Sequence, residues 1–361
     1  NKIMKYTLLD FMETTRKESL ENLDRHEELT KSFVSYLIKK KFNRIILVTC
    51  GSSNNVASNA LYFLRKYMDV PVEIVTAFEF YNYDLERADK ECLYICMSQG
   101  GRSTNINDAA RGLKAAGCEV IGLSENKNSP LGKSACAVFE YGRTGVDDYV
   151  YKSFVQQTMF IMLSCMRYSL LTKKMTQETY DLLLCQIRKA INALDDVRAL
   201  AIDFYNKNKV MLKEMDRVIV LGCGPTMGTA KEAALKMQET YACQATAFEM
   251  EEYFHGPSLC CNKDTTIFLI DDKNSRIHHR VQEAYRASCV LTDRTIMITN
   301  DSTVDGKYII HIEDYALQDV ISVLYLIVPF QYFCYILMDE TQVSAIGRQG
   351  KKSDAFYKIK E

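Results

Sequence analysis

The stretch Arg44-Ile-Ile-Leu-Val-Thr-Cys-Gly-Ser-Ser53 (RIILVTCGSS) joins a short apolar run to a turn that carries a glycine and two hydroxyls. An apolar run of this length, bounded by a turn, is typical of a buried strand. The residues that follow, through Arg65, have helical spacing. The stretch therefore predicts a strand, a tight turn and a helix, the repeating unit of an open α/β sheet.

The same order returns in the second half of the chain. Arg217-Val-Ile-Val-Leu-Gly-Cys-Gly224 again places an apolar run before a Cys-Gly turn, and helical spacing continues from about 226 to 241. Further apolar runs alternate with helical or loop segments, as parallel strands with crossover helices do. We predict strands at 72–76, 92–97, 119–123, 266–270 and 295–299.

A repeated tetrapeptide supports an internal duplication. TAFE occurs at 76–79 and at 246–249, an offset of 246 − 76 = 170, whereas Arg44 and Arg217 differ by 217 − 44 = 173. A deletion of three residues in the intervening helix, between the Cys-Gly turn and TAFE, reconciles the two offsets. On this interpretation both TAFE copies mark the same strand of each half.

The composition excludes several classes of protein. The 361 residues are enough for two domains, and 45 Lys plus Arg nearly balance 46 Asp plus Glu. Without a strong overall field we expect no nucleic-acid partner and no membrane partner. Val320–Met338 is uncharged and long enough to span a bilayer, but its polar residues and acidic flanks predict a buried helix, bent near Pro329.

The 13 cysteines are scattered, several of them in apolar runs, and no secretory signal begins the chain. We therefore expect a reducing, cytoplasmic location with most thiols in the core. Cys223, Cys260 and Cys261 could suggest a metal site. We predict none, because there is no CxxC pair and the five histidines are not spaced as ligands.

Two loops are candidates for a phosphate site, Cys50–Asn55 and Ser98–Thr104 (SQGGRST). Each follows a predicted strand, and the carboxyl ends of parallel strands meet at one edge of the sheet. Glycine allows close approach of the backbone, and the hydroxyls can donate to phosphate oxygens. Ser53 and Ser103 could instead serve only as helix caps, but two such loops in one half favour a phosphate pocket.

Acid–base groups are concentrated in the second half. Glu232, Lys236 and Glu239 are spaced by four and three, so they share one helical face. The alternative is a solvated, salt-bridged face, which the position at the ligand-binding edge disfavours. His255 follows a run of acids and precedes a Gly-Pro turn, and an imidazole can move protons near neutral pH.

Together these motifs resemble the sugar isomerase (SIS) superfamily in its tandem form. The resemblance is to the isomerase half of glucosamine-6-phosphate synthase and to stand-alone fructosamine-6-phosphate deglycases, and it covers about residues 40–352 through CGSS, SQGGRST, EAALKMQE, EEYFHGP and VPFQ. It implies two tandem SIS domains, each a mostly parallel sheet flanked by helices in a flavodoxin-like three-layer sandwich. The expected organisation is a helical lead-in (1–40), domains at 41–200 and 201–340, and a tail (341–361) that contributes to the active site.

The resemblance also implies roles for single residues. Glu239 is the expected base, and His255 the ring-opening residue, donated by a neighbouring subunit of a homodimer or larger homo-oligomer with shared active sites. The synthase has SQSGET where this chain has SQGGRS, so Gly100 lacks one hydroxyl. The expected substrate-binding residues are Ser52, Ser53, Ser98, Gln99, Gly100, Ser103, Thr104, Glu232 and Lys236.

The tail departs from the synthase pattern. Lys352 before Ser353 is the nearest match to its Schiff-base lysine, and no glutaminase domain precedes the first strand. The resemblance therefore implies a deglycase that acts, without a cofactor, on an aminated fructose 6-phosphate, moves a proton between C1 and C2, and releases an amine and glucose 6-phosphate. The alternatives are an aminating or deaminating glucosamine-6-phosphate isomerase and a non-catalytic phosphosugar-binding regulator.

Overall fold

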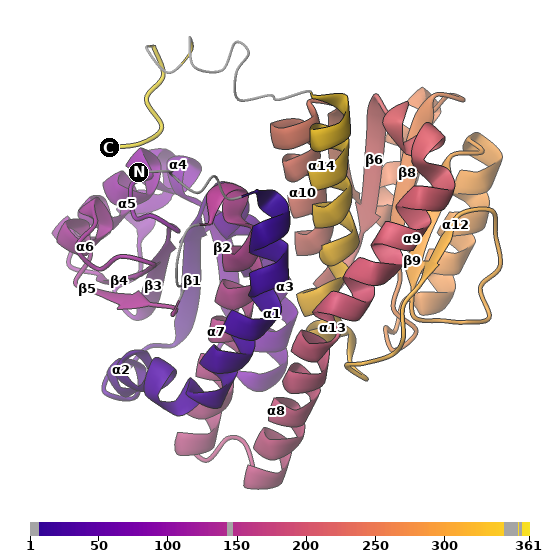
Figure 1. The fold of residues 1–361 in the computed structure, drawn as a ribbon. Helices are drawn as coiled ribbons and strands as arrows, with labels where there is room; N and C mark the ends of the chain where they lie inside the picture. The colour runs from indigo at the N-terminus through magenta and orange to yellow at the C-terminus, as the bar shows by residue number, and fades with distance from the viewer. Residues whose placement is uncertain (1–6, 143–146, 343–352, 354–355) are drawn as a thin grey trace, which may run out of the picture. The chain divides into compact units, whose positions relative to one another are not determined.

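A computed structural model describes residues 7–142, 147–342, 353 and 356–361. The chain divides into two compact units. The first unit contains the described residues 17–142, 147–185, 353 and 356–361, and the second contains 7–16 and 186–342. The divisions fall within helices α1 (Leu8–Asp24) and α8 (Gln177–Asn192). Each unit has its own parallel five-stranded sheet (Figure 1).

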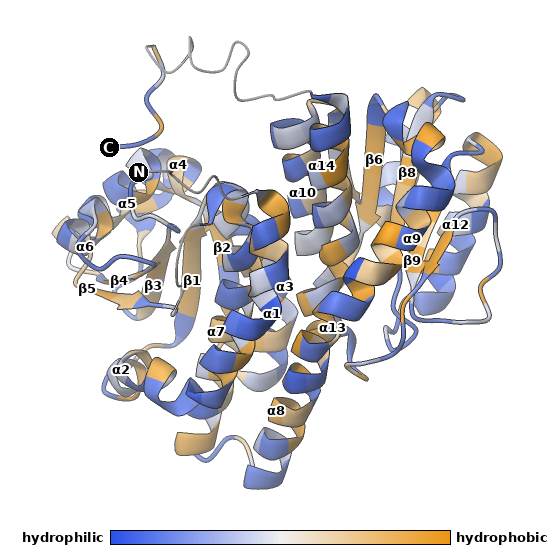
Figure 2. Cartoon of the chain, in the orientation of Figure 1, coloured by the Kyte–Doolittle hydropathy of each residue, from blue (hydrophilic) through white to orange (hydrophobic). Residues whose placement is uncertain are grey.

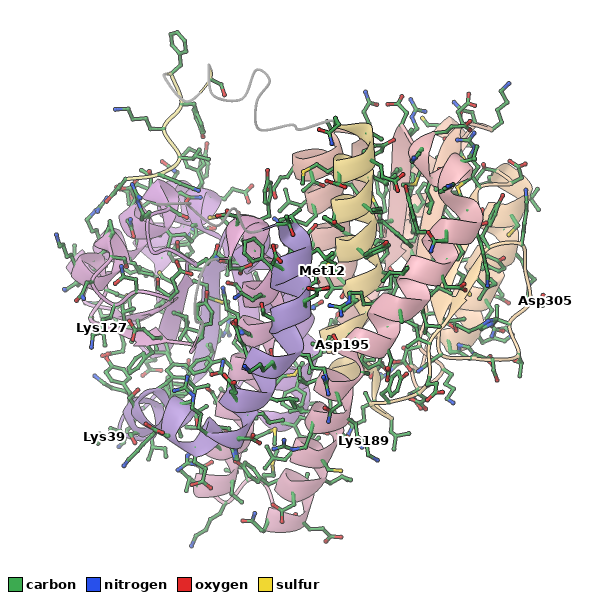
Figure 3. All side chains as sticks on the ribbon, in the orientation of Figure 1. Met12, Lys39, Lys127, Lys189, Asp195 and Asp305 are labelled. Atoms are coloured by element: carbon green, nitrogen blue, oxygen red, sulfur yellow. The ribbon has the colours of Figure 1, made fainter. Side chains whose placement is uncertain are left out.

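The sheet of the first unit has the order β2-β1-β3-β4-β5, and all its strand pairs are parallel. Its central strand β3 is buried along its whole length, as an apolar strand covered by helices on both faces must be. Charged side chains such as those of Lys39 and Lys127 point away from this layered core (Figure 3). The strands are β1 (Arg44–Thr49), β2 (Val72–Thr76), β3 (Cys92–Met97), β4 (Glu119–Ser124) and β5 (Ala137–Glu140); the helices are α2 (His26–Ile38), α3 (Gly51–Tyr67), α4 (Ala77–Glu79), α5 (Thr104–Ala115), α6 (Pro130–Ser134) and α7 (Tyr151–Leu171).

The sheet of the second unit has the order β10-β9-β8-β6-β7, again all parallel. Hydrophobic residues are concentrated along β8 and β9, which are buried throughout (Figure 2). The strands are β6 (Arg217–Gly222), β7 (Gln244–Glu249), β8 (Thr265–Ile270), β9 (Thr295–Thr299) and β10 (Ile309–His311); the helices are α9 (Leu194–Lys213), α10 (Met227–Lys236), α11 (Met250–Phe254), α12 (His278–Leu291), α13 (Asp319–Leu326) and α14 (Val328–Thr341).

Numbered within its own half, each sheet has the strand order 2-1-3-4-5, which is that of flavodoxin-like folds. The predicted α/β fold, two parallel sheets flanked by helices, is therefore confirmed. In such sheets ligands bind outside the carboxyl ends of the strands where the strand order reverses. That point lies between β1 and β3 in the first unit and between β6 and β8 in the second.

The strand registers confirm a duplication but contradict our interpretation of TAFE. Ile45 pairs with Val72 in the first unit, and Val218 pairs with Ala245 in the second, so 218 − 45 and 245 − 72 both equal 173. At that offset the equivalent of Thr76 is Glu249, since 249 − 76 = 173. The first TAFE leaves the strand after its threonine, whereas the second lies within β7. The two copies are three residues out of register, so the proposed deletion is wrong.

Two other predictions concern single helices. The uncharged segment forms α13 and α14 with a break at Ile327, and 89% of its most apolar window is buried, which confirms a buried, interrupted helix. The helix predicted to 241 ends as an α-helix at Lys236 and continues as a π-helical turn, Met237–Tyr241. A single π-turn is too short to change the apolar pattern of the segment, so the sequence does not reveal it.

Candidate active site

The first candidate loop connects β1 to α3 at the point where the strand order of the first unit reverses. Gly51 begins α3 with φ +55°, a left-handed conformation that favours glycine. Ser52 and Ser53 lie in the first turn of α3, and Ser53 is buried. The backbone N–H groups of a first helical turn have no partner within the helix, so this turn can accept an anion.

The second candidate loop connects β3 to α5. Ser98 Oγ lies 3.2 Å from Ser103 Oγ, and Ser103 precedes the first residue of α5. The buried hydroxyl of Thr104 has no hydrogen-bond partner among the described residues. The Cys50 thiol, 3.5 Å from Asn105 Oδ1, links the two loops. The structure thus brings the predicted phosphate-binding hydroxyls to one edge of the sheet.

Gln99 uses its side chain for a contact that we did not predict. Its Nε2 donates to Ser153 Oγ at 3.0 Å and to the carbonyl oxygen of Asp147 at 3.4 Å. The Asp147 carboxylate accepts the N–H groups of Lys152 and Ser153 at 3.0 and 2.7 Å, so it caps the start of α7. In this structure the Gln99 amide therefore positions a neighbouring turn.

The turn that Gln99 holds is strained. Tyr149 and Val150 have φ values of 62° and 63°. A β-branched residue such as Val150 rarely adopts positive φ, and strain of this kind concentrates at functional sites. The hydrogen bonds of Gln99 and Asp147 therefore fix this turn beside the candidate phosphate loop.

Ser124 and Ser129 also border this loop, although we did not select them from the sequence. Ser124 Oγ donates to the carbonyl oxygen of Gln99 at 2.8 Å. The Ser129 hydroxyl is buried and has no hydrogen-bond partner among the residues that the structure describes. A Cβ on Gly101 would lie 2.0 Å from Ser129 Oγ, and Gly101 has φ +65°. The Ser129-Pro130 pair predicts a helix start, but nothing in the sequence places it beside Gly101.

In the second unit Glu232, Lys236 and Glu239 form one charged cluster. Lys236 Nζ lies 2.5 Å from Glu239 Oε2 and 3.4 Å from Glu232 Oε1. Glu232 and Lys236 are 1% and 2% exposed, so this is not the solvated helical face of the alternative interpretation. Burial alone would lower the pKa of Lys236, but the two carboxylates outweigh burial and raise it. The ammonium therefore stays charged at neutral pH.

Glu239 is the accessible member of this cluster, with 38% of its side chain exposed. It lies in the π-helical turn Met237–Tyr241, which ends at Ala242 with φ 61°. π-Turns are rare and are often found at functional sites. A carboxylate that is held by a buried ammonium and open on its other side is suited to accept a proton from a ligand.

The remaining predicted residues are less constrained. His255 follows α11, donates its backbone N–H to the carbonyl oxygen of Glu252 at 3.2 Å, and has an exposed side chain. Lys352 lies outside the described residues. Within the described ranges, no three His, Cys, Asp or Glu side chains are grouped to hold a metal ion. The predicted phosphate residues belong to the first unit, and the predicted acid–base residues belong to the second.

Comparison with known proteins identifies one family. A model of the SIS domain matches residues 36–167 and 211–306. The glutamine–fructose-6-phosphate aminotransferase (isomerizing) of Aquifex aeolicus is 22% identical over 301 residues, 82% of this chain and 49% of that protein. The corresponding protein of Corynebacterium efficiens is 24% identical over 354 residues, 92% of this chain and 53% of that protein. The chain thus spans about half the length of these curated relatives.

Solved structures share the fold. A candidate phosphosugar isomerase from Clostridium difficile 630 superimposes with a TM-score of 0.85 at 22% identity, over 94% of this chain and 95% of that chain. The C-terminal domain of glucosamine-fructose-6-phosphate aminotransferase from Francisella tularensis gives 0.77 at 18% identity, over 93% and 97%. Glucosamine-6-phosphate deaminase from Thermotoga maritima gives 0.70 at 20% identity, over 92% and 96%.

Proposed function

We propose, from the premise that this chain belongs to the SIS domain family, that it is an enzyme acting on the 6-phosphate of an aminated ketose. Its relatives include the isomerizing aminotransferases, in which the match lies within about half of the protein. The observation that carries the proposal is the cluster of Glu232, Lys236 and Glu239, because a surface helix would not bury an ammonium between two carboxylates.

The proposed reaction needs a phosphate site and a base. The loops at Cys50–Ser53 and Ser98–Thr104 would hold the phosphate through hydroxyls and the N–H groups of α3 and α5. Glu239 would remove a proton from C1 of the open-chain ketoamine and return one to C2, which converts the C1–N bond into an imine. Water then adds to C1, the C–N bond breaks, and an amine and glucose 6-phosphate leave.

The buried charges explain why Glu239 can act as the base. Its partner Lys236 is charged at neutral pH and fixes one carboxylate oxygen at 2.5 Å. Glu232 contacts the same ammonium from the buried side, at 3.4 Å. His255, exposed at the end of α11, is the proposed ring-opening acid, contributed to a neighbouring subunit of a homo-oligomer. All 13 cysteines are free thiols, which supports a reducing cytoplasmic location.

Two alternatives predict different products. An aminating or deaminating glucosamine-6-phosphate isomerase would use the same proton transfer but would take up or release ammonia. A regulator would bind the phosphosugar and leave it unchanged, and the retained cluster around Lys236 disfavours that function.

The test is to incubate the purified chain with a panel of 6-phosphorylated fructosamines and with glucosamine 6-phosphate, and to measure glucose 6-phosphate, fructose 6-phosphate and released amine. Glucose 6-phosphate from a fructosamine supports the deglycase. Fructose 6-phosphate and ammonia from glucosamine 6-phosphate would support the deaminase instead. Ligand-induced thermal stabilisation without any product would support the regulator.

A further inference from the structure

The described C-terminal residues 356–361 lie against the candidate phosphate loop of the same unit. Ser103 and Lys360 form an isolated antiparallel bridge. The Thr104 N–H donates to the carbonyl oxygen of Ile359 at 3.1 Å, and the Glu361 N–H donates to the carbonyl oxygen of Arg102 at 2.8 Å. These backbone bonds lay the segment along the start of α5.

Charged groups add to this contact. Arg102 Nε donates to the backbone oxygen of Glu361 at 2.8 Å. Arg111 lies further along α5. Its Nη2 is 2.7 Å from the Glu361 carboxylate and 2.6 Å from the Asp108 carboxylate. Two guanidinium groups, one in the loop and one in α5, therefore hold oxygen atoms of the segment, in the way that they would hold oxygens of an anion.

The segment buries little apolar surface. Phe356, Tyr357 and Ile359 are 93%, 67% and 56% exposed. Its attachment therefore depends on backbone hydrogen bonds and surface ion pairs, which are individually weak in water. A contact of this kind can be displaced by a ligand that offers better oxygen acceptors.

We infer that residues 356–361 are a displaceable plug, which occupies the phosphate loop in the free protein and leaves when a phosphorylated ligand binds. The Thr104 N–H is the first of α5, where a phosphate oxygen would be accepted, and the Ile359 carbonyl now takes that place. The segment and the phosphate group therefore exclude each other. This inference rests on the proposed phosphate site. It adds that the segment and the phosphate group compete for that site, which the reaction itself does not require.

The experiment measures, by calorimetry, the binding of inorganic phosphate to three proteins and one control. They are the full chain, a variant that ends at residue 355, and Glu361→Pro, which removes the N–H that bonds to Arg102. Phe356→Ala is the matched control, because that side chain is 93% exposed and the change leaves the backbone bonds intact. A plug that is docked in about nine-tenths of the molecules would weaken apparent binding about tenfold.

We expect the variant ending at 355 to bind phosphate about tenfold more tightly than the full chain, Glu361→Pro to lie between them, and Phe356→Ala to match the full chain. Hydrogen exchange of the Glu361 amide should then rise when phosphate is added. Equal affinities in all proteins would overturn the plug and leave the phosphate site intact, and weaker binding without the segment would show instead that it is part of the site. Phosphate binding to none of them would overturn both the plug and the proposed phosphate site.

Discussion

At the scale of single residues, Lys236 holds the acid–base cluster together. Replacing it with Met leaves the buried Glu232 without its cation, and an uncompensated buried charge costs about 3–5 kcal/mol. We expect Lys236→Met to lower the free energy of unfolding by about that amount in urea titrations. The double variant Glu232→Gln/Lys236→Met should recover part of the loss.

The control for this change is Lys231→Met, on the same helix but only partly buried. We expect it to alter the free energy of unfolding by less than about 0.5 kcal/mol, as is usual near a surface. If Lys236→Met were as stable as this control, the ammonium would not be compensating a buried charge.

His278 provides a pH-dependent residue away from the proposed chemistry. Its Nδ1 lies 2.9 Å from Asp271 Oδ1, and its Nε2 lies 3.1 Å from Asp301 Oδ2. Burial would lower the pKa of His278, but the two carboxylates outweigh burial and raise it above the value of a free histidine. A raised pKa in the folded state means that protonation favours folding.

The contribution of His278 to stability should be complete below about pH 6.5, the pKa in the unfolded chain, and should disappear as the pH rises through the folded value. We expect the difference in unfolding free energy between the native chain and His278→Gln to shrink between pH 6 and pH 9. His279→Gln is the matched control, since that side chain is 81% exposed. If the difference in unfolding free energy between the native chain and His278→Gln were constant with pH, the pairing of His278 with the two carboxylates would be contradicted.

At the scale of elements, the loop between β3 and α5 depends on one of its two adjacent glycines. A Cβ on Gly101 would lie 2.0 Å from Ser129 Oγ in a left-handed backbone, whereas a Cβ on Gly100 would meet nothing within 4 Å. Strain of this kind costs about 1–3 kcal/mol. We expect Gly101→Ala to weaken phosphate binding at least tenfold in calorimetry, and Gly100→Ala to weaken it less. Equal effects of the two changes would remove the steric explanation.

The central strands and the edge strand β2 were predictable from the sequence, whereas the edge strands β5 and β10 were not. The runs that became β1, β3, β6 and β8 are apolar because both faces of a central parallel strand are covered. The edge strands β5 and β10 were missed because they have four and three residues. The amide contacts of Gln99 join residues 48 and 54 positions apart, and no local pattern encodes them.

At the scale of the whole molecule, the two halves of the chain share one strand order but carry different residues in the loops at the carboxyl ends of their strands. The regular offset of 173 relates the first three strands of each half, so the loop after β8 is the counterpart of the candidate phosphate loop after β3. That second loop begins with Asp271 and Asp272, both buried, instead of hydroxyls and glycines. Carboxylates repel an anion, so the second loop lacks the kind of groups that we propose to bind phosphate in the first.

This asymmetry predicts one phosphate per chain. Calorimetric titration with a sugar phosphate should give a stoichiometry near one ligand per chain. The double variant Ser98→Ala/Ser103→Ala should abolish this binding. A stoichiometry of two would contradict the assignment of the two edges.

The TAFE repeat shows why the alignment of the two halves must come from the strand pairing in the structure. Identical letters at 76–79 and 246–249 suggested equivalence, but the hydrogen-bonded pairs place them three residues apart. The duplication was predictable from the strand and turn order. Its alignment was not, because a short match in a strand carries no information about which partner each residue faces.

The central claim is that Glu239 is the base of a phosphosugar enzyme. The most direct measurement is the initial rate of glucose 6-phosphate release from the fructosamine substrate that the panel identifies, for the native chain, Glu239→Gln and the exposed control Glu178→Gln. We predict that Glu239→Gln lowers kcat by about 10²–10⁴-fold, while ligand-induced thermal stabilisation is retained and the control keeps its full rate. Native turnover in Glu239→Gln would contradict the mechanism.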